Sequence, residues 1–208
     1  MSARPRKATD EAIYEAAHRV MGRLGPTEWT LAEVAAEVGL TAGALVQRFG
    51  SKRELQLAIM DGFEDVAGET FARLRQEHAS PLAALYAYAD CIAQMGESPG
   101  GLAHHLAYLQ LDLTDPDFHR HLSAYARATR AELRALIDEA IRRGELAPTD
   151  SETLARTIDV TLSGSLLTWG IYQEKTAAEW LREDLDIVLR PHRPPEAGAR
   201  TGLADKRG

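Results

Sequence analysis

Three helix starts fall between Thr30 and Leu55, a stretch of 26 residues, so the first two helices there can be only about two turns long. Thr30 with Glu33 predicts a capping box, in which the hydroxyl and the carboxylate each bond an amide that the helix leaves free. Apolar residues then recur at helical spacing until Gly39, a residue suited to the left-handed position after a helix. Thr41 starts the second helix. Two short helices joined by a glycine turn form a helix-turn-helix, whose second helix can enter the major groove of DNA.

The second helix, between Thr41 and Gly50, has a narrow apolar side formed by Leu45 and Phe49. Its other residues are small or form hydrogen bonds, so the backbone can come close to base edges and phosphates. Glutamine can pair with adenine and arginine with guanine or a phosphate, while alanine and threonine methyl groups can contact thymine. This composition predicts a recognition helix.

The helix starts around it favour the same interpretation, because each directs free amides and partial positive charge toward a phosphate. A third start is predicted at Ser51, with Glu54 completing its capping box. Lys52 follows in the first turn, where a cation opposes the helix dipole, so we expect an anion nearby; an exposed lysine without a role is the alternative. The residues predicted to contact DNA are Lys7, Thr30, Thr41, Ala42, Gly43, Val46, Gln47, Arg48 and Lys52.

Periodicity alone does not separate this pattern from a helical hairpin that only packs, but the letters also resemble a known family. The segment is similar to the DNA-binding domain of TetR-family transcriptional regulators. The matching letters are VAAEVGLT at 34–41, GALVQRF at 43–49 and SKREL at 51–55. The family's frequent tyrosine and histidine, which commonly touch backbone phosphates, fall on Val46 and Arg48. The resemblance therefore implies a methyl contact at most for Val46, whereas Arg48 can replace histidine with a permanent charge.

The charge is unevenly distributed along the chain. The net charge is −7, yet residues 1–53 hold eight Lys or Arg against six acids, a balance of +2, which leaves −9 for the rest. We therefore expect DNA to meet the N-terminal end. Arg4, Pro5, Arg6 and Lys7 form a flexible basic arm that could reach a phosphate or the minor groove, or could be a solvated tail.

The single cysteine, Cys91, excludes an internal disulfide and suits a reducing cytoplasm. No apolar stretch follows Met1, so secretion is not expected. These features predict a cytoplasmic protein.

Helical periodicity runs almost throughout, and no alternating strand pattern occurs, so the predicted fold is all-α with about nine helices. One helix is expected before the helix-turn-helix, at about 10–24. Others are expected after it at about 52–77, 81–96, 101–112 and 116–144, then from Thr149 with Glu152 and from Thr176 with Glu179. We predict a helix-turn-helix domain at 1–53, a larger helical effector-binding and dimerisation domain at 54–190, and a disordered tail at 191–208.

A run of fourteen residues without charge, Val160–Gln173, predicts a helix that is buried all round. It is too short and too polar to span a membrane. One chain has too few helices to cover every face, so we expect a second copy to cover one, and the small residues of the run would allow close approach. TetR-like regulators dimerise through their last two long helices, and this layout resembles theirs. The predicted dimer contacts are Leu162, Ser165, Leu166, Trp180, Leu181, Leu185 and Val188.

Polar and aromatic residues occur where a simple core would be aliphatic. Family members bind a small effector inside such a helical cage, so the resemblance implies a ligand cavity here; core packing with a satisfied polar tip is the alternative for each residue. The predicted ligand residues are Tyr88, Cys91, Met95, His104, His105, Tyr108, Thr168, Trp169 and Tyr172.

An enzyme is not expected. Cys91 with His104 or His105 lacks a third orienting group, and the histidines at 104/105 and 119/121 lack the i, i+4 spacing of a zinc site, so neither metal nor cofactor is predicted. The sequence predicts a homodimeric repressor that a small-molecule effector releases from a pseudo-palindromic DNA operator. The alternative is a helical dimeric ligand-sensing or interaction module that has lost DNA binding.

Overall fold

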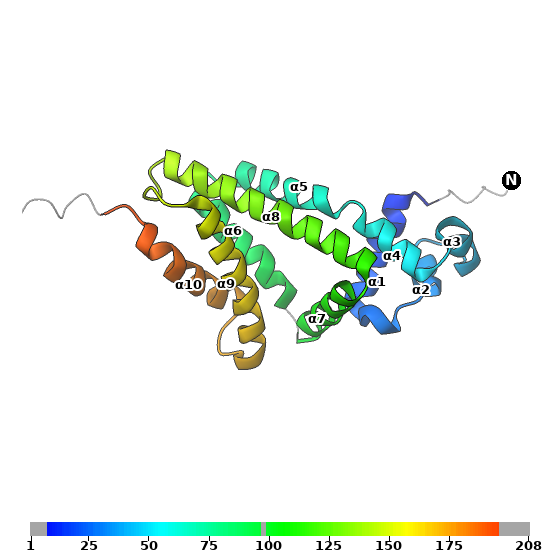
Figure 1. The fold of residues 1–208 in the computed structure, drawn as a ribbon. Coiled ribbons are helices and arrows are strands. Elements are labelled where there is room, and N and C mark those ends of the chain that lie inside the picture. The colour runs from blue at the N-terminus through cyan, green and yellow to red at the C-terminus, as the bar shows by residue number, and fades with distance from the viewer. Residues whose placement is uncertain (1–7, 97–98, 196–208) are drawn as a thin grey trace, which may run out of the picture. The chain divides into compact units, whose positions relative to one another are not determined.

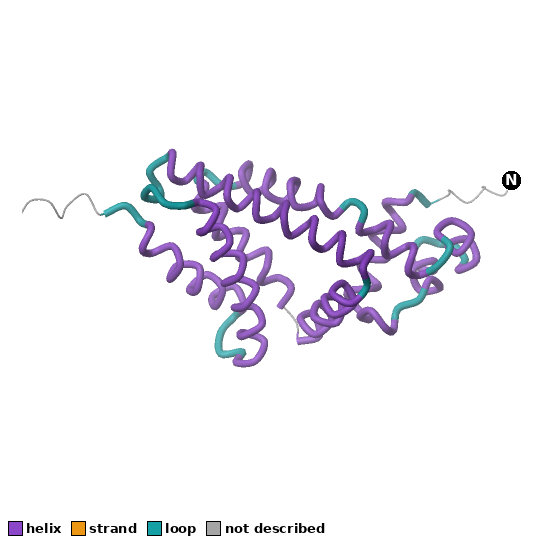
Figure 2. The backbone as a smooth tube through the Cα atoms, in the orientation of Figure 1, coloured by secondary structure: helices purple, strands orange, loops and turns teal. Residues whose placement is uncertain are grey.

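The computed structural model describes residues 8–96 and 99–195, and this part of the chain contains α-helices and no β-strand (Figures 1 and 2). None of the described helices is long and apolar enough to cross a membrane. The described α-helices are α1 Asp10–Glu28, α2 Leu31–Glu37, α3 Ala42–Phe49, α4 Lys52–Met60, α5 Phe63–Glu77, α6 Pro81–Ala93, α7 Pro99–Thr114, α8 Pro116–Arg142, α9 Ser151–Tyr172 and α10 Ala177–Leu189, with short 3-10 turns η1 Gln94–Gly96 and η2 Arg190–His192. The all-α prediction is confirmed.

The helices form two compact units. The first extends to Glu69 and also includes Met95–Ala128, and the second contains Thr70–Gln94 and the chain from Thr129 onward. Helices α5 and α8 therefore contribute residues to both units. The predicted boundaries at residues 53 and 190 stay a prediction.

Local capping fixes the short helices α2 and α3 as the sequence predicts. The Thr30 amide donates to Glu33 Oε2 at 2.7 Å, and the Glu33 amide donates back to Thr30 Oγ1 at 3.4 Å, which completes the capping box. Gly39 takes a φ of 68°, and Thr41 Oγ1 accepts from the Ala44 amide at 3.2 Å to start α3. An apolar core holds α1 to α4 together; its fully buried side chains include Ile13, Val20, Trp29, Val34, Leu45 and Leu55.

The predicted helix over 52–77 is two helices, because the chain turns at Asp61 and Gly62. Glycine and aspartate are weak helix formers, and the buried positions shift there as well. Val66 is 44% exposed, whereas Ala67 is buried. This break raises the number of described α-helices from the expected nine to ten.

Two predicted caps differ in detail. The Glu54 amide donates to Ser51 Oγ at 3.2 Å, but the Glu54 carboxylate contacts the Ser51 hydroxyl rather than its amide, so the box is half formed. Helix α9 is capped by Asp150 instead of Thr149, since the Asp150 carboxylate accepts from two amides of the first turn. A carboxylate satisfies two free amides where a hydroxyl satisfies one.

In the second unit, α10 lies beside α9 and α6 (Figure 1). One face of α9 is buried in this unit, but the opposite face is bare: Val160, Leu167 and Ile171 are 62%, 45% and 79% exposed. The uncharged run is thus covered on one side only within a single chain.

The predicted dimer contacts lie mostly on the covered side. Trp180 and Val188 are half-buried. The other five are at most 5% exposed within the single chain: Leu162, Ser165, Leu166, Leu181 and Leu185. Because they already fill the core of one chain, they have no surface to offer a second copy.

Candidate nucleic-acid interface

Helix α3 has one side in the core and the other in solvent. Leu45 is fully buried, whereas Thr41, Gly43, Val46 and Gln47 are exposed. Val46 is 48% exposed, although an apolar side chain gains nothing from contact with water. The bare side of α3 therefore combines a capped helix start, an exposed methyl group and an amide side chain, which is the chemistry that reads the major groove.

Arg48 lies in the last turn of α3 and is bound to the start of α1. Its Nη1 donates to the Ala8 carbonyl at 2.7 Å, and its Nη2 pairs with Asp10 Oδ1 at 2.7 Å. The guanidinium carbon lies 5.7 Å from the centre of the Phe49 ring. Since arginine has five N–H donors, Arg48 keeps donors for a phosphate or a base, and that contact stays a prediction.

Lys52 is engaged by the last turn of α1 and by Trp29, which follows it. Its ammonium Nζ lies 2.8 Å from the carbonyl oxygen of Pro26, 2.7 Å from that of Trp29 and 3.4 Å from that of Thr27. It also lies 4.5 Å from the centre of the Trp29 ring. Burial is the main influence on this group and lowers the pKa of Lys52, against the opposing effect of Glu28 and Glu33.

These contacts give Lys52 partners within the chain, which its place in the first turn of α4 does not reveal. Carbonyl groups at a helix end carry partial negative charge, so the cation in the first turn of α4 is compensated without a phosphate. A phosphate contact by Lys52 stays a prediction, and it would require Nζ to release one of these carbonyls.

Thr30, Thr41 and Ala42 complete the described part of the predicted interface. Thr30 and Thr41 are exposed and Ala42 is half-buried. Both threonine hydroxyls accept a hydrogen bond from an amide of their own helix. The first amides of each helix therefore stay available as donors. Lys7 lies outside the described residues.

Arg53 forms an ion-pair network that the sequence analysis did not assign. Its guanidinium donates to Asp115 Oδ1 and Oδ2 at 2.9 Å and to Asp117 Oδ2 at 2.7 Å, at the corner where α7 passes into α8. The hydrogen bonds from Arg53 lower the pKa of Asp115. The sequence Asp115-Pro116-Asp117 could have indicated this network, because it starts a helix and also places two carboxylates close together.

Four predicted ligand residues belong to the first unit, and two of them contact the segment from α1 to α2. His104 Nδ1 lies 3.1 Å from the Gly22 carbonyl oxygen, so this nitrogen carries the hydrogen, and the ring lies against Gly25. The phenol oxygen of Tyr108 is buried beside Trp29, and burial raises the pKa of Tyr108. Met95 is half-buried and His105 is exposed. Here α7 packs on α1 through residues that we expected in a cavity.

The other five lie in the second unit. Tyr88 is buried with its ring centre 4.7 Å from that of Phe71. Cys91 Sγ lies 3.9 Å from an Arg73 nitrogen. Near the end of α9, Thr168 and Tyr172 are exposed, and Trp169 donates to the Lys175 carbonyl at 2.8 Å.

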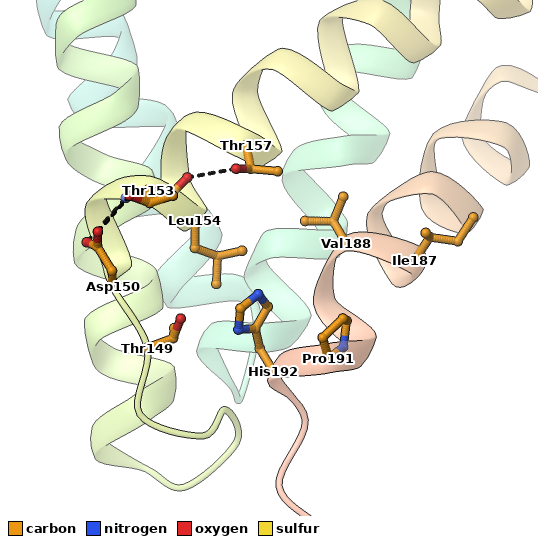
Figure 3. A pocket seen from close by; sticks show the side chains of 9 residues that line it. All are labelled: Thr149, Asp150, Thr153, Leu154, Thr157, Ile187, Val188, Pro191 and His192. Atoms are coloured by element: carbon orange, nitrogen blue, oxygen red, sulfur yellow. Dashed lines mark hydrogen bonds between the residues drawn. The ribbon is translucent and has the colours of Figure 1, made fainter.

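A cleft of about 270 Å³ occurs elsewhere in the second unit, between the start of α9 and the end of α10 (Figure 3). Residues of α9 and of the segment before it form one side, residues of α10 and η2 form the other, and none of the nine predicted ligand residues takes part. Its lining residues are Thr149, Asp150, Thr153, Leu154, Thr157, Ile187, Val188, Pro191 and His192. Across the described ranges, no three side chains of His, Cys, Asp or Glu gather as metal ligands would.

Comparison with known families gives two matches. Residues 13–59 match the family described as "Bacterial regulatory proteins, tetR family". Residues 81–185 match the family described as "Tetracyclin repressor-like, C-terminal domain". The second match alone covers more than half of the chain. A comparison with curated protein sequences finds no match.

Solved structures share the fold at low sequence identity. A TetR transcription regulator from Haloarcula marismortui is 18% identical with a TM-score of 0.73, covering 89% of this chain and 98% of that one. SmeT, the repressor of a multidrug efflux pump of Stenotrophomonas maltophilia, is 18% identical with a TM-score of 0.64, covering 97% and 98%. FadR from Bacillus subtilis in complex with stearoyl-CoA is 16% identical with a TM-score of 0.65, covering 87% and 98%.

Proposed function

The chain belongs to the tetR family of bacterial regulatory proteins, and from this premise we propose that it is a homodimeric repressor. It binds a pseudo-palindromic operator through α3 and leaves that operator when a small molecule binds its helical domain. The single observation that carries the proposal is the bare face of α3, which presents Thr41, Val46 and Gln47 to solvent beside a fully buried Leu45.

A second copy is supported by the bare face of α9. Val160, Leu167 and Ile171 are spaced seven and four residues apart, so they lie along one side of the helix, with the exposed Gly164 between them. Ile187 adds a 58% exposed side chain on the neighbouring α10. These residues replace the buried set as the proposed contact. A two-fold axis would then place two copies of α3 about 34–36 Å apart, in successive major grooves.

The effector is proposed from the family. FadR is solved with stearoyl-CoA, and SmeT is the repressor of a multidrug pump, so acyl-CoA thioesters and antibiotics form the first screening panel. A compound that binds the folded protein raises its melting temperature. The same compound should weaken DNA binding about 5- to 150-fold, the usual range of coupling between two sites.

An electrophoretic mobility shift tests DNA binding. The probe is the DNA that flanks the protein's own coding region, and a scrambled duplex of equal length and composition is the control. We expect a shift that favours the flanking DNA and weakens as salt rises, because bound protein releases counterions from phosphates. Equal affinity for both duplexes, or binding that ignores salt, contradicts the proposal.

The second candidate is an interaction module without DNA binding. It is favoured by Arg48 in the last turn of α3 and Lys52 at the start of α4, two cations that already bond the chain's own carbonyl and carboxylate oxygens. Absence of any shift at low salt, from a protein that sediments as a dimer, would support this candidate instead.

A further inference from the structure

The bare side of α9 carries no charge along almost the whole helix. Residues three or four apart lie on one side of a helix, and α9 keeps one such stripe exposed from Thr153 to Ile171, which are eighteen residues or about 27 Å apart. The outer face of a surface helix is normally charged or polar. The uncharged stripe contains Thr153, Thr157, Val160, Gly164, Leu167, Thr168 and Ile171. A face of this length without charge suits contact with protein.

The cleft of about 270 Å³ lies at the N-terminal end of the uncharged stripe, because Thr153 and Thr157 belong to both (Figure 3). Its lining combines aliphatic residues such as Leu154 and Val188 with polar ones such as His192. A side chain with an apolar body and a polar tip matches such a lining, and tyrosine has this chemistry.

Two large side chains protrude at the other end of the stripe. Ile171 is 79% exposed, and the neighbouring Tyr172 is 59% exposed. The Tyr172 ring stacks on the Trp180 ring of α10, with centres 6.0 Å apart and planes at 20°. The ring is therefore held by its own chain while most of the residue stays accessible. One end of the stripe is hollow and the other end protrudes.

Two copies of such a surface are complementary when they run in opposite directions. A two-fold axis across the middle of the stripe, between Val160 and Gly164, brings Ile171 and Tyr172 of each copy to the cleft of the other. The same axis sets Val160 of each copy against Gly164 of the other, where a Cβ would have no neighbouring atom within 4 Å. A parallel pair would place cleft opposite cleft and leave both without a side chain.

The charges beside the stripe favour the same direction. Arg156 near its N-terminal end and Glu174 just after its C-terminal end are exposed, and neither forms an ion pair with another of the described residues. The adjacent Lys175 already pairs with Glu183. Opposite directions bring Arg156 of one copy toward Glu174 of the other, whereas a parallel pair brings two Arg156 side chains to the same end.

We propose that α9 pairs with α9 of a second copy in the opposite direction, and that Tyr172 of each copy completes the cleft of the other. The pairing rests on the proposed homodimer and adds its direction and the residue that each copy contributes to the other. The ring would cover Leu154 and Val188, and the hydroxyl would face the polar part of the lining. The cleft is therefore a site that one chain leaves incomplete.

Cysteine cross-linking measures the direction of pairing. In a Cys91→Ser background, Thr153→Cys and Ile171→Cys are introduced singly and together, and the full chain is treated with a short bismaleimide. We expect covalent dimers from the double variant, since each new cysteine lies opposite the other one in the second copy. The single variants are the matched controls, because their two cysteines would lie about 27 Å apart and should stay unlinked.

Sedimentation of Tyr172 variants tests what occupies the cleft. Tyr172→Ala should raise the dissociation constant of the dimer about 30-fold or more, since two sites each lose a buried ring, and Tyr172→Phe should weaken it less because the ring is kept. Val188→Ala should also weaken the dimer. The two alanine changes together should weaken it by less than the product of their separate effects, because both remove the same contact.

Each outcome decides the proposal. Covalent dimers from Ile171→Cys alone, a dimer that the double variant does not link, or effects of Tyr172→Ala and Val188→Ala that simply multiply would overturn the pairing while leaving the homodimeric repressor intact. An unmodified chain that sediments as a monomer contradicts the proposed function itself, and the pairing fails with it.

Discussion

Asp112 offers a direct test of the packing of α7 through the dependence of stability on pH. The carboxyl is half-buried, and burial raises the pKa of Asp112 from 3.8 to about 6. Burial, and to a smaller extent the charge of Asp112, raises the pKa of the Tyr108 phenol. Ionised Asp112 thus lies in a place that favours its neutral form, and the variant Asp112→Asn removes the charge with little change of shape.

The sign follows from the two states of the chain. Between about pH 4 and pH 6 the unfolded chain has released this proton while the folded chain still holds it, so stability falls as pH rises through this window. Above about pH 7 the loss is complete. A rise of the pKa from 3.8 to about 6 corresponds to about 3 kcal/mol, which we reduce to about 1–2 kcal/mol because the side chain keeps partial access to solvent.

Thermal unfolding of the full chain, followed by circular dichroism, measures the effect. Asp112→Asn should raise the melting temperature at about pH 7.5 by about 2–8 °C, and the gain at about pH 5 should be roughly half as large. The control Glu69→Gln, at an exposed position of α5, should change stability by less than about 0.5 kcal/mol at either pH. An equal gain at both pH values, or a loss at pH 7.5, would refute the burial of this charge.

Three other predictions use the same protein. Ile171→Glu, on the bare face of α9, should give monomers by sedimentation with the helical content kept, whereas Leu166→Glu in the core should unfold the chain; a dimer that survives Ile171→Glu discards the proposed contact. Lys52→Ala should lower the free energy of unfolding by about 1–3 kcal/mol, since three carbonyls lose a charged donor, and unchanged stability in denaturant would show that these bonds are dispensable. Gln47→Ala should alter which base pairs a random pool selects while the salt slope stays the same; a uniform loss across sequences assigns Gln47 to the phosphates instead.

Most of the fold could be predicted from local signals in the sequence. The capping residues Thr30 and Thr176 and the turn at Gly39 act within a few residues of themselves, so their effect can be predicted without knowledge of the rest. The break at Asp61 and Gly62 was missed because the apolar letters continue through it, and only the packing of both helices shows that Val66 has turned outward.

The site was harder to predict because its side chains have partners far away in the sequence. Lys52 was interpreted by its place in a helix, yet its ammonium bonds a turn that lies more than twenty residues earlier. Likewise, the uncharged run on α9 predicts burial but not which face is buried by which partner. Leu162 and Leu166 were assigned to the second copy, whereas α6 and α10 contact α9 inside the same chain. Composition sets how much apolar surface a helix has, and tertiary contacts decide where each face points.

The first turn of α4 makes the contacts that hold this helix in place, close to the end of α3. Lys52 bonds the carbonyls of the turn that ends α1, while the adjacent Arg53 pairs with Asp115 at the corner after α7. Helix α7 holds the same turn from its own side, because the His104 ring lies so close to Gly25 that a Cβ there would come within 2.7 Å of it. Gly25 also has a φ of 74°, which other residues rarely adopt. A displacement of α7 in the first unit therefore acts on α4 through two neighbouring residues, and α4 begins only three residues after α3 ends.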